Sequence, residues 1–118
     1  MHAKDLPGKP DLVFRRQRLA VFVDGDFWHG RNWEKRRASL EKGHNAPYWI
    51  DKIAYNIERD KRNDALLEQA GWRVLRLWET DVTKQPSVEA DRVVKAVRDR
   101  ERIEESPLAL VKVSQEVN

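Results

Sequence analysis

Acidic, histidine and aromatic side chains gather in one short stretch near the start of the chain. An apolar run at 19–23 is followed by Asp24-Gly25-Asp26-Phe27-Trp28-His29-Gly30, and Asp11 precedes an earlier apolar run. Carboxylate oxygens can hold a hard divalent cation, and a histidine with a pKa near neutrality can accept a proton from water. Hydrolysis of a phosphodiester uses both functions, whereas a grip on DNA needs exposed rings and positive charge.

Each of these residues also has an ordinary structural explanation. Asp11 could cap an Asx turn, Asp24 and Asp26 on either side of Gly25 are typical of a turn, and His29 alone is typical of a surface turn. However, adjacent strands that end in acids can bring carboxylates together, which is unfavourable unless a cation neutralises them. The combination therefore favours a cation site with His29 as general base.

A further acid lies in a predicted helix. Asp60 continues, three residues on, the face that Ile53 and Ile57 define, so a charge stands where the apolar stripe would run on. Asp60 either marks the end of the buried face or points at the strand ends, where it would orient a histidine or a water molecule.

Aromatic and basic side chains adjoin the acidic cluster. Consecutive side chains on an extended segment point in opposite directions, so Phe27 and Trp28 cannot both be core residues there, and an exposed ring can insert between base pairs. Residues 31–37 read Arg-Asn-Trp-Glu-Lys-Arg-Arg, which is either a solvated loop or a surface for phosphate groups. The predicted DNA contacts are Phe27, Trp28, Trp49, Arg31, Lys35, Arg36 and Arg37.

Two strands and a long helix must position these residues. Residues 12–14 and 19–23 are predicted to form an antiparallel hairpin around the charged turn at 15–18. A helix then follows Asn45-Ala46-Pro47, with apolar spacing as far as Ala70 and a stop at Gly71. This helical crossover would lay a third strand, 72–78, parallel to the second.

The remaining segments are less regular. Residues 31–46 have no hydrophobic period and are predicted to form a mobile loop. After Pro86, Ser87 can cap a helix that reaches about Ile103 and packs on an edge of the sheet. Residues 108–113 form either a short strand or a tail.

The composition indicates one soluble domain over residues 1–118, with a core at about 6–105 and a tail at 106–118. Of the 118 residues, 40% are hydrophobic and 36% are charged, and no apolar stretch is long enough to cross a bilayer. The chain has no cysteine and starts without a secretory signal, so we expect a cytoplasmic location. The net charge of +3 alone is weak evidence for nucleic acid.

Four blocks of the sequence carry a family resemblance. They read Leu-Pro-Gly-Lys-Pro-Asp at 6–11, Phe-Val-Asp-Gly-Asp-Phe-Trp-His-Gly at 22–30, Trp-Ile-Asp-Lys-Ile-x-x-Asn-Ile-Glu-Arg-Asp at 49–60, and Gly-Trp-Arg-Val-Leu-Arg-Leu-Trp-Glu at 71–79. In content, order and spacing they resemble the very-short-patch repair (Vsr-type) DNA mismatch endonucleases of the PD-(D/E)XK superfamily. The resemblance implies an α/β, restriction-endonuclease-like core, a mixed β-sheet flanked by α-helices, that nicks double-stranded DNA using Mg²⁺.

The resemblance also implies roles for individual residues. By position, Asp11 looks like the central metal ligand, and Val23 would add its backbone carbonyl. His29 would activate water, Asp60 would pair with His29, and Asp24 would be a further metal ligand or an active-site acid. The aromatics that would wedge into the duplex beside a thymine–guanine mismatch are Phe27, Trp28 and Trp49.

The chain also departs from the family pattern. Asp26, Arg31 and Trp33 occupy positions of zinc ligands, so we expect no structural zinc and another contact in its place. The family's N-terminal helix and first strand would be missing, and a second copy or an N-terminal partner fragment could cover the sheet edge. The leading hypothesis is a magnesium-dependent DNA endonuclease. The alternative is a catalytically silent, split or truncated DNA-binding domain of the same fold.

Overall fold

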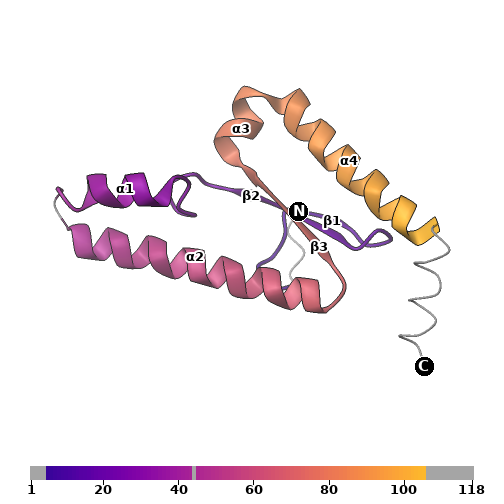
Figure 1. Ribbon diagram of the computed structural model, residues 1–118, viewed down its shortest axis with the longest axis horizontal. Helices are drawn as coiled ribbons and strands as arrows, with labels where there is room; N and C mark the ends of the chain where they lie inside the picture. The colour runs from indigo at the N-terminus through magenta and orange to yellow at the C-terminus, as the bar shows by residue number, and fades with distance from the viewer. Residues whose placement is uncertain (1–4, 44, 106–118) are drawn as a thin grey trace.

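The computed structural model describes residues 5–43 and 45–105, with side chains as far as Arg102. Three strands and four helices occur in this part of the chain (Figure 1). In order they are β1 (Leu12–Phe14), β2 (Leu19–Asp24), α1 (Trp33–Leu40), α2 (Ala46–Gln69), β3 (Arg73–Trp78), α3 (Glu79–Lys84) and α4 (Pro86–Glu105).

The strands form one mixed sheet in the order β1-β2-β3. β1 pairs antiparallel with β2, and β2 pairs parallel with β3. The predicted hairpin and the predicted helical crossover are therefore confirmed. Because β1 runs opposite to β2, the start of β1 lies beside the end of β2, which brings Asp11 to the same sheet end as Asp24.

Alternating side chains of β2 build two cores, one on each face of the sheet. Leu19 and Val21 pack with Leu77 of β3 and Ala96 of α4, whereas Ala20 and Phe22 pack with Leu67 of α2. Figure 1 shows α2 and α4 on opposite sides of the sheet. The prediction that the last helix packs on a sheet edge is wrong. α4 covers one face of the sheet, where its buried Ala96 packs with side chains of β2 and β3.

The segment 31–46, predicted to be a mobile loop, contains helix α1. None of the residues of α1 is buried, so the helix has no apolar stripe that a periodicity argument could detect. Its residues include Glu, Lys, Arg, Ala and Leu, which have high intrinsic helix propensity. The sequence also did not predict the short helix α3.

Helices α2 and α4 begin and end close to the predicted residues, but the predicted capping side chains do not cap them. Asn45 precedes α2 with a φ of 57°, but its side chain makes no capping hydrogen bond. α4 begins at Pro86, so Ser87 lies inside the first turn and not at the cap. Gly71, with a φ of 88°, follows α2 in the left-handed conformation that ends helices.

Two further observations concern the ends of the chain and membranes. The predicted strand or tail at 108–113 lies outside the described residues. No helix within the described ranges combines the length and the apolar composition that a membrane span requires.

Candidate active site

An open cavity of about 560 Å³ lies where the start of β1 meets the end of β2. Its lining includes the four predicted catalytic residues, Asp11, Asp24, His29 and Asp60, together with Arg76 of β3. These side chains come from the strand ends, the turn after β2, α2 and β3. The fold therefore brings together residues that are far apart in the sequence.

Asp11 is fixed by the backbone of β2. Its N–H donates to the Val21 carbonyl at 2.9 Å, and its Oδ2 accepts from the Val23 N–H at 2.7 Å. Alternate residues of a strand direct their N–H and C=O groups to the same side, so the backbone of Val23 faces Asp11 and not β3. The two predicted ligands, a carboxylate and a backbone carbonyl, lie on one side of the strand.

The turn after β2 places His29 through close contact with α2. The Asn56 side chain, buried in α2, donates to the Trp28 carbonyl at 2.9 Å. Gly30 has a φ of 73°, and a Cβ there would lie 2.5 Å from Cδ1 of Ile57. A side chain at position 30 would therefore push the turn away from α2. Sequence analysis missed both Asn56 and Gly30, although a glycine directly after the candidate base His29 was a usable signal.

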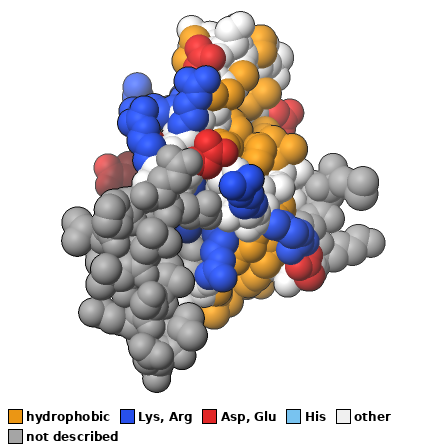
Figure 2. All heavy atoms as spheres, turned by 90° about the vertical axis from the view of Figure 1, so that its right-hand side faces the viewer, with side chains coloured by type: hydrophobic (Ala, Val, Ile, Leu, Met, Phe, Trp, Pro, Cys, Tyr) orange, Lys and Arg blue, Asp and Glu red, His pale blue; other side chains and the backbone are white. Residues whose placement is uncertain are grey.

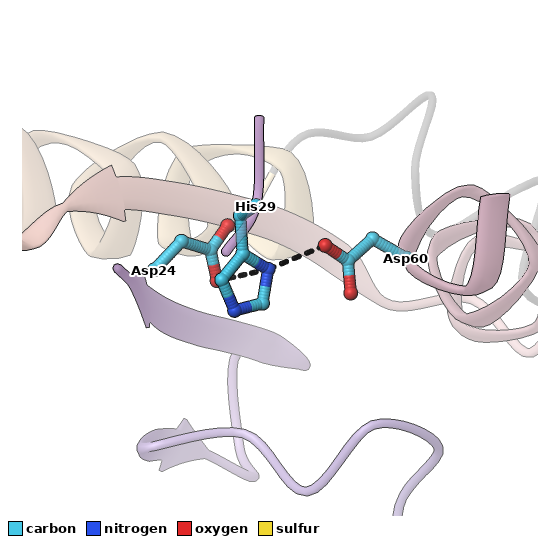
Figure 3. Close-up of side chains that lie close together, drawn as sticks. All are labelled: Asp24, His29 and Asp60. Carbon is cyan, nitrogen blue, oxygen red and sulfur yellow. Dashed lines mark hydrogen bonds and ion pairs between the residues drawn. The ribbon is translucent and has the colours of Figure 1, made fainter. Parts of the chain in front are cut away.

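His29 lies between two carboxylates (Figure 3). Its Nδ1 is 2.5 Å from Oδ2 of Asp60 and 3.7 Å from Oδ1 of Asp24. The hydrogen bond to Asp60 raises the pKa of His29 above its ordinary value, and burial only partly offsets this effect. Burial would raise the pKa of Asp60, but hydrogen bonding to His29 and the nearby Arg76 lower it overall. Because Nδ1 faces Asp60, Nε2 is the ring nitrogen that can take a proton from water.

Asp24 is bound by an arginine that sequence analysis did not single out. Nη1 of Arg76 donates to both Asp24 oxygens, at 2.9 and 3.0 Å. Burial raises the pKa of Asp24 despite this favourable charge. The signal for Arg76 was a charged residue in the middle of a partly buried strand, a position that requires a partner.

The donor chemistry of the cavity suits a divalent cation. Carboxylate and carbonyl oxygens, as offered by Asp11 and Val23, are the ligands that Mg²⁺ prefers. Asp24, His29 and Asp60 also form a group whose ligand atoms lie within 4.8 Å of one another. In that second group, His29 and Asp60 are bonded to each other and Arg76 binds Asp24.

The predicted aromatic residues form one cluster beside the cavity. The Trp49 ring centroid lies 5.8 Å from Phe27 and 5.6 Å from Trp28. Phe27 and Trp28 lie in the turns at 26–32 and not on an extended segment, and their ring centroids are 5.1 Å apart. The expected exposure is nevertheless present, since 42% of Trp28 is accessible.

The predicted basic residues occupy two environments. Lys35 and Arg37 are exposed on α1, and the Arg36 guanidinium lies 5.3 Å from the Phe27 ring. Arg31 instead donates to Asp26 at 3.0 Å and to Asp81 at 2.9 Å.

Basic side chains are not confined to the cavity. Figure 2 views the end of the molecule toward which α4 runs, where lysine and arginine side chains lie among acidic ones on the surface. The basic residues among those that line the cavity are Lys9, Arg59 and Arg76, and the lining includes no residue of α1.

Asp26 ties the turn to α3. Its Oδ1 accepts from the Thr80 N–H at 3.1 Å and from the Thr80 hydroxyl at 2.7 Å, while Oδ2 accepts from Arg31. Burial would raise the pKa of Asp26, but these hydrogen bonds lower it overall. The Asp26 network, defined as Asp26, Arg31, Thr80 and Asp81, thus connects positions where the family resemblance implied zinc ligands.

Comparisons with known proteins concern the family of the chain. The family model described as DNA mismatch endonuclease Vsr matches residues 1–35. The type II nicking enzyme V.NmeDIP of Neisseria meningitidis serogroup C is 49% identical over 94 residues, covering 80% of this chain and 62% of the relative. V.HpaIIP of Haemophilus parainfluenzae is 40% identical, covering 79% of this chain and 64% of the relative.

The DNA mismatch endonuclease Vsr of Escherichia coli K12 is 38% identical over 74 residues, covering 63% of this chain and 46% of that protein. The chain therefore spans less than two thirds of the length of these curated relatives. The family model and these identities together support assignment of the chain to the Vsr-type family.

Proposed function

We propose that this chain is a DNA endonuclease that uses Mg²⁺ to cut one strand of a duplex. The observation that carries the proposal is the meeting of Asp11, His29 and Asp60 at one cavity beside an aromatic cluster whose Trp28 is exposed. The relatives named as type II nicking enzymes support the same reaction class. The restriction-endonuclease-like core implied by the sequence blocks is part of this proposal.

Asp11 and the Val23 carbonyl would hold the Mg²⁺ ion. When bound, the ion supplies positive charge that stabilises the phosphate oxygens as negative charge develops on them. Asp24, the third predicted ligand, lies in the same cavity with both oxygens bound by Arg76.

His29 acts as the base that accepts a proton from the attacking water at Nε2. Asp60 holds the imidazole by its Nδ1 and stabilises the positive charge that the ring gains. Asp60 is thus a positioning residue, because it acts through His29.

The aromatic cluster and the basic residues bind the duplex. Trp28, with Phe27 and Trp49 behind it, inserts beside bases, and a thymine–guanine mismatch is the preferred target because a weakened base pair is easier to unstack. Lys35, Arg36 and Arg37 of α1, and Arg31 at the edge of the Asp26 network, meet phosphates.

A nicking assay tests this function. Supercoiled plasmid and duplex oligonucleotides, matched and with a T·G mismatch, are incubated with the protein in Mg²⁺ or in EDTA. We expect Asp11→Asn to lower nicking about 10³-fold, which corresponds to about 4 kcal/mol of lost transition-state stabilisation. Asp91→Asn, which changes an exposed acid on α4, is the matched control. Binding without nicking by the wild-type chain would instead identify a silent or partial DNA-binding domain.

A further inference from the structure

Arg76 lines the cavity and lies close to three carboxylates. Its Nη1 binds both Asp24 oxygens, its Nη2 lies 2.7 Å from Asp64 Oδ1, and its Nε lies 3.0 Å from the same atom. Nη2 is also 3.9 Å from Asp60 Oδ1. The pairing of Phe22 with Arg76 in the β2·β3 register points Arg76 toward α2, where Asp60 and Asp64 lie one turn apart.

The guanidinium is held firmly and is largely shielded from water. Only 21% of the Arg76 side chain is exposed, and its guanidinium carbon lies 4.1 Å from the centre of the Phe22 ring. The planar fork of arginine suits this role because it can bind two carboxylates at once, which a lysine ammonium cannot do with the same geometry.

We propose that Arg76 is the built-in counter-cation of the cavity: it binds Asp24 in place of a divalent ion and so leaves one Mg²⁺ site in the DNA-free chain, held by Asp11 and Val23. This inference rests on the proposed function, which includes the Mg²⁺ ion. Arg76 is a positioning residue, because it holds Asp24 3.7 Å from His29 without itself being assigned to the reacting atoms.

The alternative is a second ion bound by Asp24, His29 and Asp60. Each of these three ligands already has a partner, and an ion on Asp24 would have to displace the Arg76 guanidinium. The displaced guanidinium would stay near the ion because Asp64 also holds it, and two like charges in a partly buried site repel each other strongly. Removing Arg76 should therefore create a second cation site.

Counting bound Mn²⁺ by electron paramagnetic resonance, without DNA, tests the proposal. We expect one ion per wild-type chain, none in Asp11→Asn, and two in Arg76→Met. The double variant Arg76→Met/Asp11→Asn should keep one ion, because its remaining site is the newly opened one. Arg73→Met is the matched control: it removes an exposed arginine of the same strand, 3.6 Å from Asp99, and should leave the count at one.

Thermal unfolding gives a second readout. In EDTA, Arg76→Met should lower Tm by about 10 °C or more, because three carboxylates lose their counter-charge. Addition of Mn²⁺ should raise the Tm of Arg76→Met by more than it raises the Tm of Arg73→Met. If Arg76→Met does not fold, the less acidic double variant Arg76→Met/Asp64→Asn is counted instead, and Arg76→Lys should fold and bind one ion.

Two results would overturn the proposal: two ions on the wild-type chain, or one ion on a folded Arg76→Met chain whose ion is lost with Asp11. These counts need no cleavage. A chain that binds one ion through Asp11 but never nicks DNA would overturn the proposed function and leave this inference intact.

Discussion

Asp24 and Asp26 are two residues apart, and each is bound by an arginine, yet their surroundings have opposite effects. Asp24 is 5% exposed at the cavity, and burial raises its pKa. Asp26 is bound by Thr80 and Arg31 away from the ligand group, and its pKa is lowered overall. The difference teaches that one strand end can carry two charge networks, one facing the proposed chemistry and one connecting the turn to α3.

The largest expected effect lies on the cavity side of this comparison. Asp60→Asn should lower nicking at least about 100-fold, because an amide orients His29 less well and does not stabilise the charge that it gains. The folded structure should remain, since asparagine has the same shape. Single-turnover nicking rates and circular dichroism are the measurements. Equal rates in Asp60→Asn and wild type would show that Asp60 has no role in nicking.

The Asp26 network should respond in stability and not in chemistry. Asp26→Ala removes a charged acceptor from Thr80 and Arg31, and we expect a loss of about 2 kcal/mol in the free energy of unfolding. Urea denaturation measures this loss, with Asp91→Ala as the exposed control. If Asp26→Ala instead abolished nicking in fully folded protein, the proposed division between the two networks would be wrong.

The exposed ring next to the cavity should affect DNA binding. Trp28→Ala should weaken binding of a duplex about tenfold, because loss of one stacking contact costs about 1 to 3 kcal/mol. Fluorescence anisotropy in EDTA measures this without cleavage. Tyr55→Ala, which removes an exposed aromatic side chain of α2, is the control, and equal losses of affinity in both variants would mean that Trp28 has no special role in binding.

The smallest effect is a pH dependence of stability in EDTA. Because folding raises the pKa of His29, its ion pair with Asp60 contributes stability below the ordinary pKa of 6.5. That contribution is lost as the pH rises through the higher pKa of the folded state. The Tm difference between wild type and His29→Gln should therefore be larger at pH 6 than at pH 9. A constant difference would contradict the ion pair.

The sheet could be predicted from the sequence because its signals are local. The apolar run at 19–23, the charged turn at 15–18 and the stop at Gly71 each indicate an element, and the crossover helix then dictates a parallel third strand. Helix α1 could not be found in this way. It buries no residue, so the hydrophobic period that reveals α2 is missing there.

The residues of the candidate site also differ in whether they have a local signal in the sequence. Asp11, Asp24, His29 and Asp60 stood out because they adjoin or interrupt apolar patterns, and the structure brings all four to one cavity. Arg76 did not stand out, because its role depends on the β2·β3 register and on Asp64 of α2. A contact that depends on three elements cannot be predicted from the residue pattern of any one of them.

The most direct test of the active site is a single-turnover experiment with His29→Ala. The duplex is bound to excess protein in EDTA, binding is measured, and nicking is started with Mg²⁺. We predict binding within about threefold of wild type and nicking slowed at least about 100-fold, the usual scale for loss of a general base. Nicking by His29→Ala at the wild-type rate would contradict the assignment of this cavity as the site of cleavage.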